Sequence, residues 1–344
     1  MPRHDLIVIG AGPAGLAAAI AAKQAGLSFR VFEKGVLVNS LFHYPSQMVF
    51  FTTPELLEIG GLPFVTPRDK PTRDEALRYY RRVVDTYQLD ISFGHTVTGL
   101  QREAAARGAN FAVETRDAEG HEATWQARCV LLATGTYDHP NRLGISGEHL
   151  PHVSHYYTEP HPFYRQPVVV VGGKNSAAEA ALDLYRTGAH VTLVHRRPTL
   201  GASIKYWVKP DIENRITEGA IQVRFETRVV EIHETEVVVE RVARAAGAGT
   251  RDMLPAAGVF LLTGYLADLE LLERCGVTVD PGTHVPTHNS DTFETNVPGL
   301  YLAGSVVAGA NRGEVFIENG RFHGRVVVED VTRKLAQQEL GANS

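Results

Sequence analysis

The chain has 344 residues, which is enough for two domains or for one domain with a large insertion. With 44% hydrophobic and 21% charged residues, it has the composition of a globular protein. The net charge of −5 and the pI near 6.3 argue against a nucleic acid or an acidic membrane surface as a partner. Two cysteines, Cys129 and Cys275, are too few and too scattered for a disulfide scaffold, so a reducing, cytoplasmic setting is expected.

Residues 6–22 are uncharged and close to the length of a membrane-spanning helix. A spanning helix would not normally hold three glycines and a proline within six residues, and a secretory signal needs a basic start. We therefore interpret this segment as a strand, a turn and a helix, and expect no membrane partner.

The chain contains an internal repeat, because residues 5–34 align with residues 167–196 without a gap. In this alignment Gly26 matches Gly188, and Glu33 matches His195. Each copy has a continuous apolar run typical of a strand buried in a parallel sheet, then small residues, an alanine-rich helix and a second apolar strand. The pattern predicts a βαβ unit that occurs twice.

The small residues between strand and helix are those that a dinucleotide-binding turn needs. The first glycine allows a tight bend, the next small residue lets the backbone approach a pyrophosphate, and the third lets the helix pack on the strand. Two βαβ units that pack without a ligand are the alternative. The predicted contacts are Gly10, Gly12, Pro13, Ala14 and Gly15 in the first turn, and Gly172, Gly173, Lys174, Asn175 and Ser176 in the second.

The two copies differ at the end of the second strand, which predicts two different nucleotides. Glu33 can accept hydrogen bonds from both hydroxyls of an adenosine ribose and would repel a 2′-phosphate, which suits FAD. His195 is followed by Arg196 and Arg197, whose guanidinium groups suit the 2′-phosphate of NADPH, although a solvated basic loop is the alternative. Lys174, which replaces Gly12, is either a further cation for the pyrophosphate or a surface lysine.

Three later segments indicate how the chain passes between two domains. Residues 129–140 and 258–265 are apolar strands that end in Ala133-Thr134-Gly135 and in Thr263-Gly264. Residues 295–305 are a strand and turn, and a helix is expected to start near Glu314. We therefore predict an α/β fold of two Rossmann-like dinucleotide-binding domains, with an NADPH domain (139–268) inserted between two parts of an FAD domain (1–138 and 269–344).

Two connecting regions complete the expected organisation. Residues 67–88 form an amphipathic pattern, with Leu77, Tyr80, Val84 and Tyr87 on one stripe of a helix. Residues 92–128 alternate apolar and polar residues around turn signals, which predicts a β-meander. The histidines between 139 and 161 lie in a Pro/Gly-rich loop without cysteines or a carboxylate in register, so no metal site is predicted.

This order of motifs is similar to that of the thioredoxin reductase-like flavoproteins, and more specifically resembles the bacillithiol disulfide reductase family over nearly the whole chain. The stretches that carry the closer resemblance are 38–53, 70–84, 172–196, 203–216 and 316–324. The resemblance implies FAD, a preference for NADPH, reduction of an oxidised low-molecular-weight thiol, and a homo-oligomer.

The resemblance also assigns cofactor contacts. It implies that FAD is bound by Gly10, Gly12, Gly15, Glu33, Lys34, Ser40, Val97, Ala133, Thr134, Gly135, Gly304, Ser305 and the expected helix start at Glu314–Val315, and that Gly264 belongs to the NADPH site. Ser305 stands where many relatives have an aspartate, so it can hydrogen-bond but carries no charge.

The sequence departs from the family at position 14. Members that are proposed to use a redox cysteine have it within Gly-Pro-Cys-Gly, whereas this chain has Ala14, which cannot form a mixed disulfide. There is no Cys-x-x-Cys, so the dithiol relay of a thioredoxin reductase is excluded. Electrons must then reach a small disulfide, or another acceptor, without a protein thiolate. No catalytic residue is assigned, and His43, Tyr44 and His155 are candidates only for approaching the isoalloxazine.

Three alternatives to a disulfide reductase remain open at this point. A ferredoxin or flavodoxin–NADP reductase, or an NADPH oxidase, also needs FAD and NADPH without redox cysteines. A flavin monooxygenase shares both turns, although the segment from Gly144 to Tyr157 only loosely matches the fingerprint of that class. A non-enzymatic redox sensor would bind both cofactors without turnover.

Overall fold

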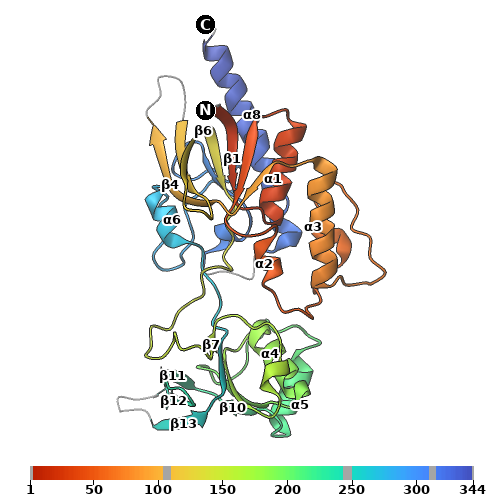
Figure 1. Ribbon diagram of the computed structural model, residues 1–344, viewed down its shortest axis with the longest axis vertical. Coiled ribbons are helices and arrows are strands. Elements are labelled where there is room, and N and C mark those ends of the chain that lie inside the picture. The colour runs from red at the N-terminus through yellow and green to blue at the C-terminus, as the bar shows by residue number, and fades with distance from the viewer. Residues whose placement is uncertain (1–2, 104–109, 243–249, 310–314, 343–344) are drawn as a thin grey trace. The chain divides into compact units, whose positions relative to one another are not determined.

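The computed structural model describes residues 3–103, 110–242, 250–309 and 315–342 (Figure 1). The chain forms two compact units. The first unit comprises residues 1–42, 48–139 and 265–344, and the second comprises residues 43–47 and 140–264.

The first unit is built on one sheet. Its elements are β1 (Arg3–Ile9), α1 (Pro13–Gln24), β2 (Phe29–Glu33), α2 (Asn39–Phe42), η1 (Pro54–Leu57), α3 (Arg73–Tyr87), β3 (Ile91–Phe93), β4 (Thr96–Glu103), β5 (Asn110–Arg116), β6 (Glu122–Leu132), α6 (Leu269–Arg274), β15 (Leu300–Leu302), η3 (Gly304–Ala308), α7 (Ile317–Gly320) and α8 (His323–Ala342). Among the described residues the sheet has seven strands in the order β3-β2-β1-β6-β5-β4, with β15 also paired to β6.

Strand β6 joins the parallel and antiparallel parts of this sheet. Its first half pairs antiparallel with β5, and its second half pairs parallel with β1 on one side and β15 on the other. The predicted β-meander is confirmed in β4, β5 and β6, which are antiparallel neighbours. Because β15 comes from the last part of the chain, β6 unites the two sequence segments that flank the second unit.

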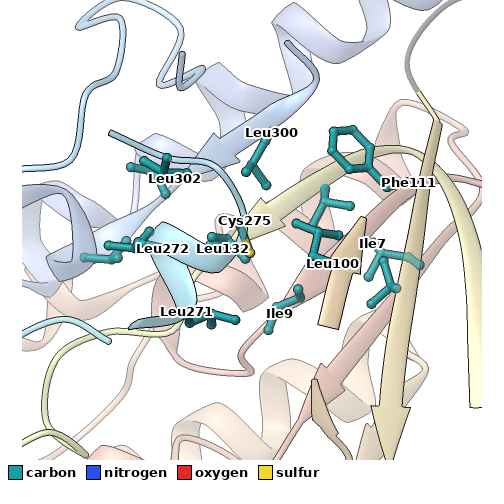
Figure 2. Packing of buried hydrophobic residues seen from close by; sticks show 14 of the residues in the cluster. Ile7, Ile9, Leu100, Phe111, Leu132, Leu271, Leu272, Cys275, Leu300 and Leu302 are labelled. Carbon is teal, nitrogen blue, oxygen red and sulfur yellow. The ribbon is translucent and has the colours of Figure 1, made fainter. Parts of the chain in front are cut away.

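A continuous apolar core fixes the late segments of the first unit to the early ones. Figure 2 shows Ile7, Leu132 and Leu300, from β1, β6 and β15, packed in one cluster with Leu271 and Cys275 from the α6 region. All five side chains are buried. Their burial favours docking of residues 269–302 on the sheet, because each large apolar side chain removed from water contributes about 1.5–3 kcal/mol.

Helix α3 forms where the amphipathic pattern predicts it, but its buried stripe is different. The buried residues are Ala76, Tyr79, Tyr80 and Val83, whereas Leu77, Val84 and Tyr87 are only partly buried. The reason is a set of long-range contacts: the Tyr79 hydroxyl accepts from the Ile59 N–H (2.9 Å), and its ring stacks on Phe64 at 4.4 Å. Arg78, Arg81 and Arg82 are exposed on the side of the helix opposite the buried stripe.

The second unit contains a parallel sheet and a small antiparallel sheet. Its elements are β7 (Val153–Ser154), η2 (His161–Phe163), β8 (Pro167–Val171), α4 (Asn175–Thr187), β9 (His190–Val194), α5 (Lys209–Thr217), β10 (Gln222–Arg224), β11 (Thr227–Ile232), β12 (Glu236–Arg241), β13 (Arg251–Pro255) and β14 (Gly258–Leu261). Among the described residues, the parallel sheet has the order β10-β9-β8-β14-β7 and the antiparallel sheet the order β11-β12-β13.

The predicted repeat is confirmed position by position. Helix α1 begins at Pro13 and α4 at Asn175, which are aligned residues of the two copies. Gly26 and Gly188 follow these helices with positive φ angles of 72° and 93°, a conformation that glycine adopts without strain. In each copy the helix connects two parallel neighbouring strands, so both copies are βαβ units. No helix in the described ranges is long and apolar enough to cross a membrane.

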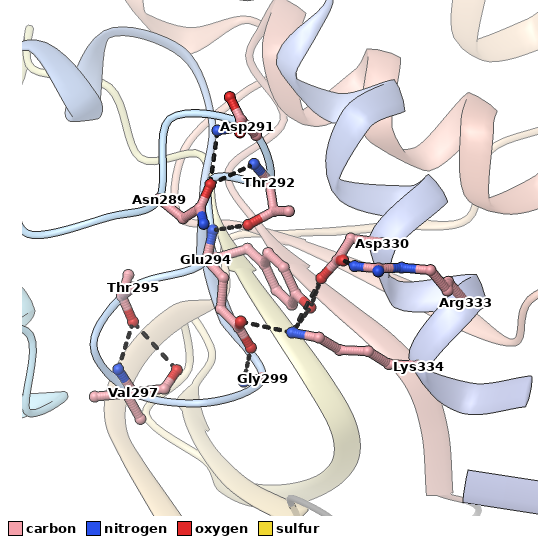
Figure 3. Close-up of polar contacts among 11 residues, drawn as sticks. Asn289, Asp291, Thr292, Glu294, Thr295, Val297, Gly299, Asp330, Arg333 and Lys334 are labelled. Carbon is pink, nitrogen blue, oxygen red and sulfur yellow. Dashed lines mark hydrogen bonds and ion pairs between the residues drawn. The ribbon is translucent and has the colours of Figure 1, made fainter. Parts of the chain in front are cut away.

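A polar network ties α8 to the loop that precedes β15 (Figure 3). The buried Tyr301 hydroxyl donates to Asp330 (2.7 Å), and Lys334 lies 3.0 Å from the same carboxylate. Lys334 also pairs with Glu294 (2.5 Å), whose other oxygen accepts the Gly299 N–H (2.8 Å). Burial alone would raise the pKa of Asp330. The hydrogen bonds that its carboxylate accepts from Arg333, Tyr301 and Lys334 outweigh this effect, so the pKa is lowered.

We expect Tyr301→Phe to lower the free energy of unfolding by about 1–2 kcal/mol, because it removes one hydrogen bond from a buried carboxylate and keeps the ring. Urea denaturation followed by circular dichroism measures this change. The matched control is Tyr164→Phe, since the Tyr164 side chain is exposed. Equal unfolding curves for Tyr301→Phe and the wild type would show that the network does not stabilise the fold.

Candidate functional site

The first turn, between β1 and α1, is shaped by two glycines that have no room for a side chain. Gly10 has φ 106°, and a Cβ on it would lie 2.5 Å from the Ala133 carbonyl oxygen at the end of β6. A Cβ on Gly15 would lie 2.0 Å from the Gly10 carbonyl oxygen. A Cβ on Gly12 would meet nothing within 4 Å. The backbone is therefore closely packed on the protein side and open at Gly12, as a pyrophosphate needs.

Helix α1 begins at this open position without a side-chain cap. Gly12 is its N-cap residue and Pro13 is its first residue, so neither supplies a capping side chain. The first N–H groups of a helix have no partner within the helix and favour an anion. The residues of this turn therefore fit a bound pyrophosphate.

Glu33, at the end of β2, has its carboxylate fixed next to the turn. Its Oε2 accepts the Ala11 N–H (2.8 Å) and its Oε1 accepts the Gly35 N–H (2.8 Å). Burial raises the pKa of Glu33, and these two N–H donors oppose the rise. Because each carboxylate oxygen has two lone pairs, Glu33 can still accept hydrogen bonds from ribose hydroxyls.

The structure brings the ends of β6 and β15 to the first turn. A Cβ on Gly135 (φ 69°) would lie 3.7 Å from the Ser305 hydroxyl oxygen, which places these two residues side by side. A Cβ on Gly304 (φ 79°) would lie 2.9 Å from the Ala14 methyl carbon. The first turn, residues 133–135 and residues 304–305 are far apart in the sequence but converge here. Thr134 is the residue between Ala133 and Gly135.

The remaining residues of the expected FAD site lie as follows. Lys34 pairs with Asp138 at 3.0 Å. Ser40 is a half-buried residue of α2, a helix tied to the turn by the Val38 N–H, which donates to the Ala11 carbonyl (3.2 Å). Val97, in β4, packs against the apolar core of the first unit.

The helix expected to start at Glu314–Val315 begins later. Glu314 lies outside the described residues, and α7 starts at Ile317. The reason is local: Phe316 has an extended backbone, and its N–H donates to the Asn319 side-chain oxygen (2.8 Å). Val315 is nevertheless close to the site, because a Cβ on Gly320 would lie 3.3 Å from both the Val315 side chain and the Gly304 Cα.

Sequence reasoning missed His323, the first residue of α8. Its Nδ1 accepts the Gly304 N–H (3.2 Å), so the ring proton is on Nε2. The ring stacks on Phe293 with 4.1 Å between centroids. Burial, and then the nearby His288, lower the pKa of His323 to about 4. His323 therefore holds the Gly304 backbone as a neutral acceptor. Its only sequence signal is its place in the family-like stretch 316–324.

The second turn, between β8 and α4, has the same close packing. A Cβ on Gly172 would lie 2.7 Å from the Ala177 Cβ and 2.8 Å from the Leu262 carbonyl oxygen. Gly173 is covered by the ring of His195, whose Cε1 is 2.3 Å from the position of a Cβ. Lys174 is the exposed N-cap residue of α4 and makes no capping hydrogen bond. The helix start is therefore open to an anion, with an ammonium group beside it.

His195, Arg196 and Arg197 lie together at the end of β9. Burial, then Arg197 and Arg196, lower the pKa of His195, which favours a neutral ring. Its Nε2 is buried and has no hydrogen-bond partner in the part of the chain that the structure describes. Such a nitrogen is costly unless a further group satisfies it. Arg196 and Arg197 are exposed, so their guanidinium groups are accessible to a phosphate.

The side chain of Asn175, the first residue of α4, contacts the protein itself. It donates to the Ser203 carbonyl (3.1 Å) and accepts the Lys205 N–H (2.9 Å). Its backbone, together with the exposed Ser176, remains at the start of the helix. Gly264 follows β14 with φ 93°, and its carbonyl accepts the Asn141 N–H (2.7 Å).

The three residues that are candidates for approaching the isoalloxazine differ in burial. His43 is exposed and Tyr44 is half-buried, and both belong to the short segment of the second unit. His155 is buried, with its Nε2 3.1 Å from the Glu148 carboxylate. Burial lowers the pKa of His155, and Glu148 opposes this. The pair of buried side chains is typical of a structural contact within the second unit.

Neither cysteine is suited to thiolate chemistry. Cys129 lies in β6, where burial raises its thiol pKa to about 12. Cys275 is buried in the core of the first unit, and its pKa is raised to about 11. Both thiols are therefore protonated at neutral pH, and a thiol must ionise to attack a disulfide.

One group of possible metal ligands lies within the described ranges. Asp117, Glu119 and His121 approach each other in the turn between β5 and β6. The group is mostly exposed, and Asp117 already accepts the backbone N–H groups of Glu119 (3.1 Å) and His121 (2.8 Å). These bonds are those of a polar hairpin turn.

Comparisons with known proteins show the family to which the chain is similar. The profile of the family described as pyridine nucleotide-disulphide oxidoreductase matches residues 7–304. Bacilliredoxin reductase of Bacillus subtilis (strain 168) is 40% identical over 336 residues, which are 97% of this chain and 99% of the relative.

Solved structures extend the likeness to three dimensions. Bacillithiol disulfide reductase from Bacillus cereus is 38% identical, with a TM-score of 0.91, over 97% of this chain and 100% of that one. A thioredoxin reductase from T. acidophilum is 22% identical, with a TM-score of 0.72, over 98% of this chain and 100% of that one, and shares the fold. The predicted thioredoxin reductase-like fold and the predicted family resemblance are confirmed.

The lowered pKa of His323 predicts a pH dependence of stability. In the unfolded chain this histidine gains a proton below its ordinary pKa of about 6.5, whereas in the folded chain it stays neutral down to about 4. The free energy of unfolding should therefore fall as the pH drops through this range. We expect this residue to contribute about 1–2 kcal/mol to the fall, because its ring is partly exposed and solvent reduces the effect.

Urea denaturation at several pH values, compared between the wild type and His323→Gln, isolates this contribution from those of other histidines. The variant should lose less stability between pH 6.5 and pH 4. Parallel pH profiles would show that folding does not lower the pKa of His323.

Proposed function

Because the chain belongs to the pyridine nucleotide-disulphide oxidoreductase family, it is a flavoprotein oxidoreductase that uses FAD and NADPH, and we propose that it reduces a low-molecular-weight disulfide of the bacillithiol type. The observation that carries the proposal is the match to a bacillithiol disulfide reductase along 97% of this chain. The overall reaction breaks one S–S bond and yields two thiols, with two electrons and one proton from NADPH and one proton from solvent.

We assign FAD to the first unit and NADPH to the second. The support is the chemistry at the end of the second strand of each βαβ unit: a fixed carboxylate at Glu33, and a neutral His195 with two exposed guanidinium groups. A carboxylate repels a 2′-phosphate, whereas arginines bind it. When bound, the two cofactors supply hydride transfer and the delivery of electrons to an acceptor.

The residues of the first unit that we assign to FAD bind and orient it. Gly10 and Gly15 let α1 approach β1 and β6, so the open backbone at Gly12 faces the ligand. His323 fixes the Gly304 backbone by accepting its N–H. We therefore propose that the site is preorganised, because its backbone positions are set by contacts within the protein.

The chain reduces its acceptor without a thiol of its own. Ala14 has no sulfur, and the pKa values of Cys129 and Cys275 are about 12 and about 11. A mixed disulfide with the protein is therefore not part of the proposed reaction. This feature also suits a ferredoxin–NADP reductase, which needs no redox cysteine and is the second candidate.

We propose a cytoplasmic setting and a homo-oligomeric assembly for this protein. Two buried, unpaired cysteines suit a reducing cytoplasm. The homo-oligomer expected from the family resemblance can be tested by light scattering of the purified protein.

The double variant Arg196→Ala/Arg197→Ala tests the NADPH assignment. We expect the KM for NADPH to rise at least about 10-fold while the KM for NADH changes little, because only NADPH carries the 2′-phosphate that charge-assisted hydrogen bonds hold. Steady-state kinetics with both coenzymes measures the preference. Arg186→Ala, a change to an exposed arginine at the other end of α4, is the matched control. An unchanged preference would show that the arginines are a solvated loop.

Anaerobic reduction by NADPH followed by stopped-flow reoxidation tests the acceptor. We expect bacillithiol disulfide to reoxidise the flavin faster than oxidised ferredoxin or oxygen does at equal concentration. Faster reoxidation by ferredoxin would identify the second candidate, and a long-lived oxygen adduct would identify a monooxygenase. Purified protein that neither contains nor takes up flavin would contradict the proposed function itself.

A further inference from the structure

A segment of the second unit, residues 200–208, lies directly on the second turn. Leu200, Ile204 and Val208 are buried and join the apolar cluster that contains the α4 helix. The backbone between them forms successive turns, in which the Ile204 N–H donates to the Gly201 carbonyl (3.2 Å) and the Val208 N–H to the Lys205 carbonyl (2.9 Å). We call residues 200–208 the arm.

Polar contacts fasten the arm to the same residues that form the turn. The Gly201 N–H donates to the Gly173 carbonyl (2.8 Å). The Asn175 side chain holds both the Ser203 carbonyl and the Lys205 N–H. The Lys205 ammonium pairs with Glu179, one turn further along α4, at 2.6 Å. The arm is thus fixed in place by contacts to the second turn and to the first two turns of α4.

The arm presents two aromatic rings outward beside this helix start. The Tyr206 side chain is 81% exposed and Trp207 is 42% exposed. Their rings form an edge-to-face pair with 4.8 Å between centroids, and the Lys205 ammonium lies 5.8 Å from the Trp207 ring. Exposed aromatic rings are unfavourable in water, and a ligand that covers them removes their apolar surface from the solvent. The pair is an exposed aromatic surface at the edge of the turn.

The position of the arm in the chain indicates which part of a dinucleotide it meets. The arm begins three residues after Arg197 and runs from the end of β9 to α5, which leads to β10. In a Rossmann unit the end of the second strand meets the adenosine half of the nucleotide. The second turn takes the pyrophosphate, so the exposed rings lie on the adenosine side of it.

We propose that the Tyr206–Trp207 pair stacks on the adenine ring of the dinucleotide bound by the second unit, and that Asn175 positions the arm for this contact. The proposal rests on the assignment of the second unit to NADPH. It gives a role to the two hydrogen bonds that join the Asn175 side chain to the arm. It also gives this stretch a binding role beyond that of the arginines, which contact the 2′-phosphate.

Fragment binding to the FAD-loaded protein tests the proposal. By isothermal titration calorimetry, Tyr206→Leu should weaken binding of 2′,5′-ADP about 10-fold and leave nicotinamide mononucleotide binding unchanged, since stacking a base on an aromatic ring has about this effect. Tyr206→Phe should retain the wild-type affinity within about 2-fold. Tyr164→Leu, which changes another exposed tyrosine of the second unit, is the matched control. Because Tyr206 is exposed, its variants are expected to fold.

Two further measurements separate stacking from a structural role. The chain has two tryptophans, Trp125 and Trp207, so in a Trp125→Phe background 2′,5′-ADP should quench the remaining emission. Tyr206→Leu should raise the KM for NADPH and leave kcat unchanged. Asn175→Ala should weaken 2′,5′-ADP binding by a similar factor.

The possible contrary results are distinct. Weaker binding of nicotinamide mononucleotide with unchanged 2′,5′-ADP would place the other end of the dinucleotide at the arm and overturn the proposal. Unchanged affinity for both fragments in Tyr206→Leu would also overturn it. A wild-type protein that binds neither NADPH nor 2′,5′-ADP would overturn the assignment of the second unit, and this inference with it.

Discussion

The arrangement of the first unit depends on the close approach of three backbone segments at Gly10. The Ala133 carbonyl lies where a side chain of residue 10 would be, and Gly15 lies against the Gly10 carbonyl. Any Cβ at either position would push α1 away from the sheet. Because Ala133 directly follows β6, and β6 also pairs with β15, this contact fixes the first turn relative to the last third of the chain. The glycines therefore position residues that they do not touch.

The second βαβ unit keeps this geometry and changes the chemistry displayed on it. Gly172 is as tightly packed as Gly10, so the scaffold is the same. The differences lie at positions that we assign to the bound nucleotides, as in Lys174 for Gly12 and His195 for Glu33. Exchanging a carboxylate for a neutral imidazole beside arginines removes repulsion toward a phosphate. A repeated fold can thus bind two different nucleotides.

The features predicted from the sequence are those that local patterns determine. The repeat predicts both βαβ units, and α1 and α4 start at aligned residues, because small residues and apolar periodicity act over a few positions. What the sequence did not reveal depends on distant partners. The buried stripe of α3 differs because Tyr79 bonds to residues 59 and 62, and the role of His323 depends on Gly304. No periodicity encodes such contacts.

The alanine at position 14 has a consequence for how the acceptor is selected. The Ala14 methyl lies against Gly304, and neither cysteine of the chain can act in its place, because both thiols are buried and protonated. An enzyme with a redox thiol recognises its substrate partly by covalent exchange, which requires a disulfide. Without that step, selection among acceptors rests on binding and geometry alone. The same scaffold can therefore serve acceptors that contain no sulfur, so direct comparison of acceptors carries more information about this chain than its cysteine content does.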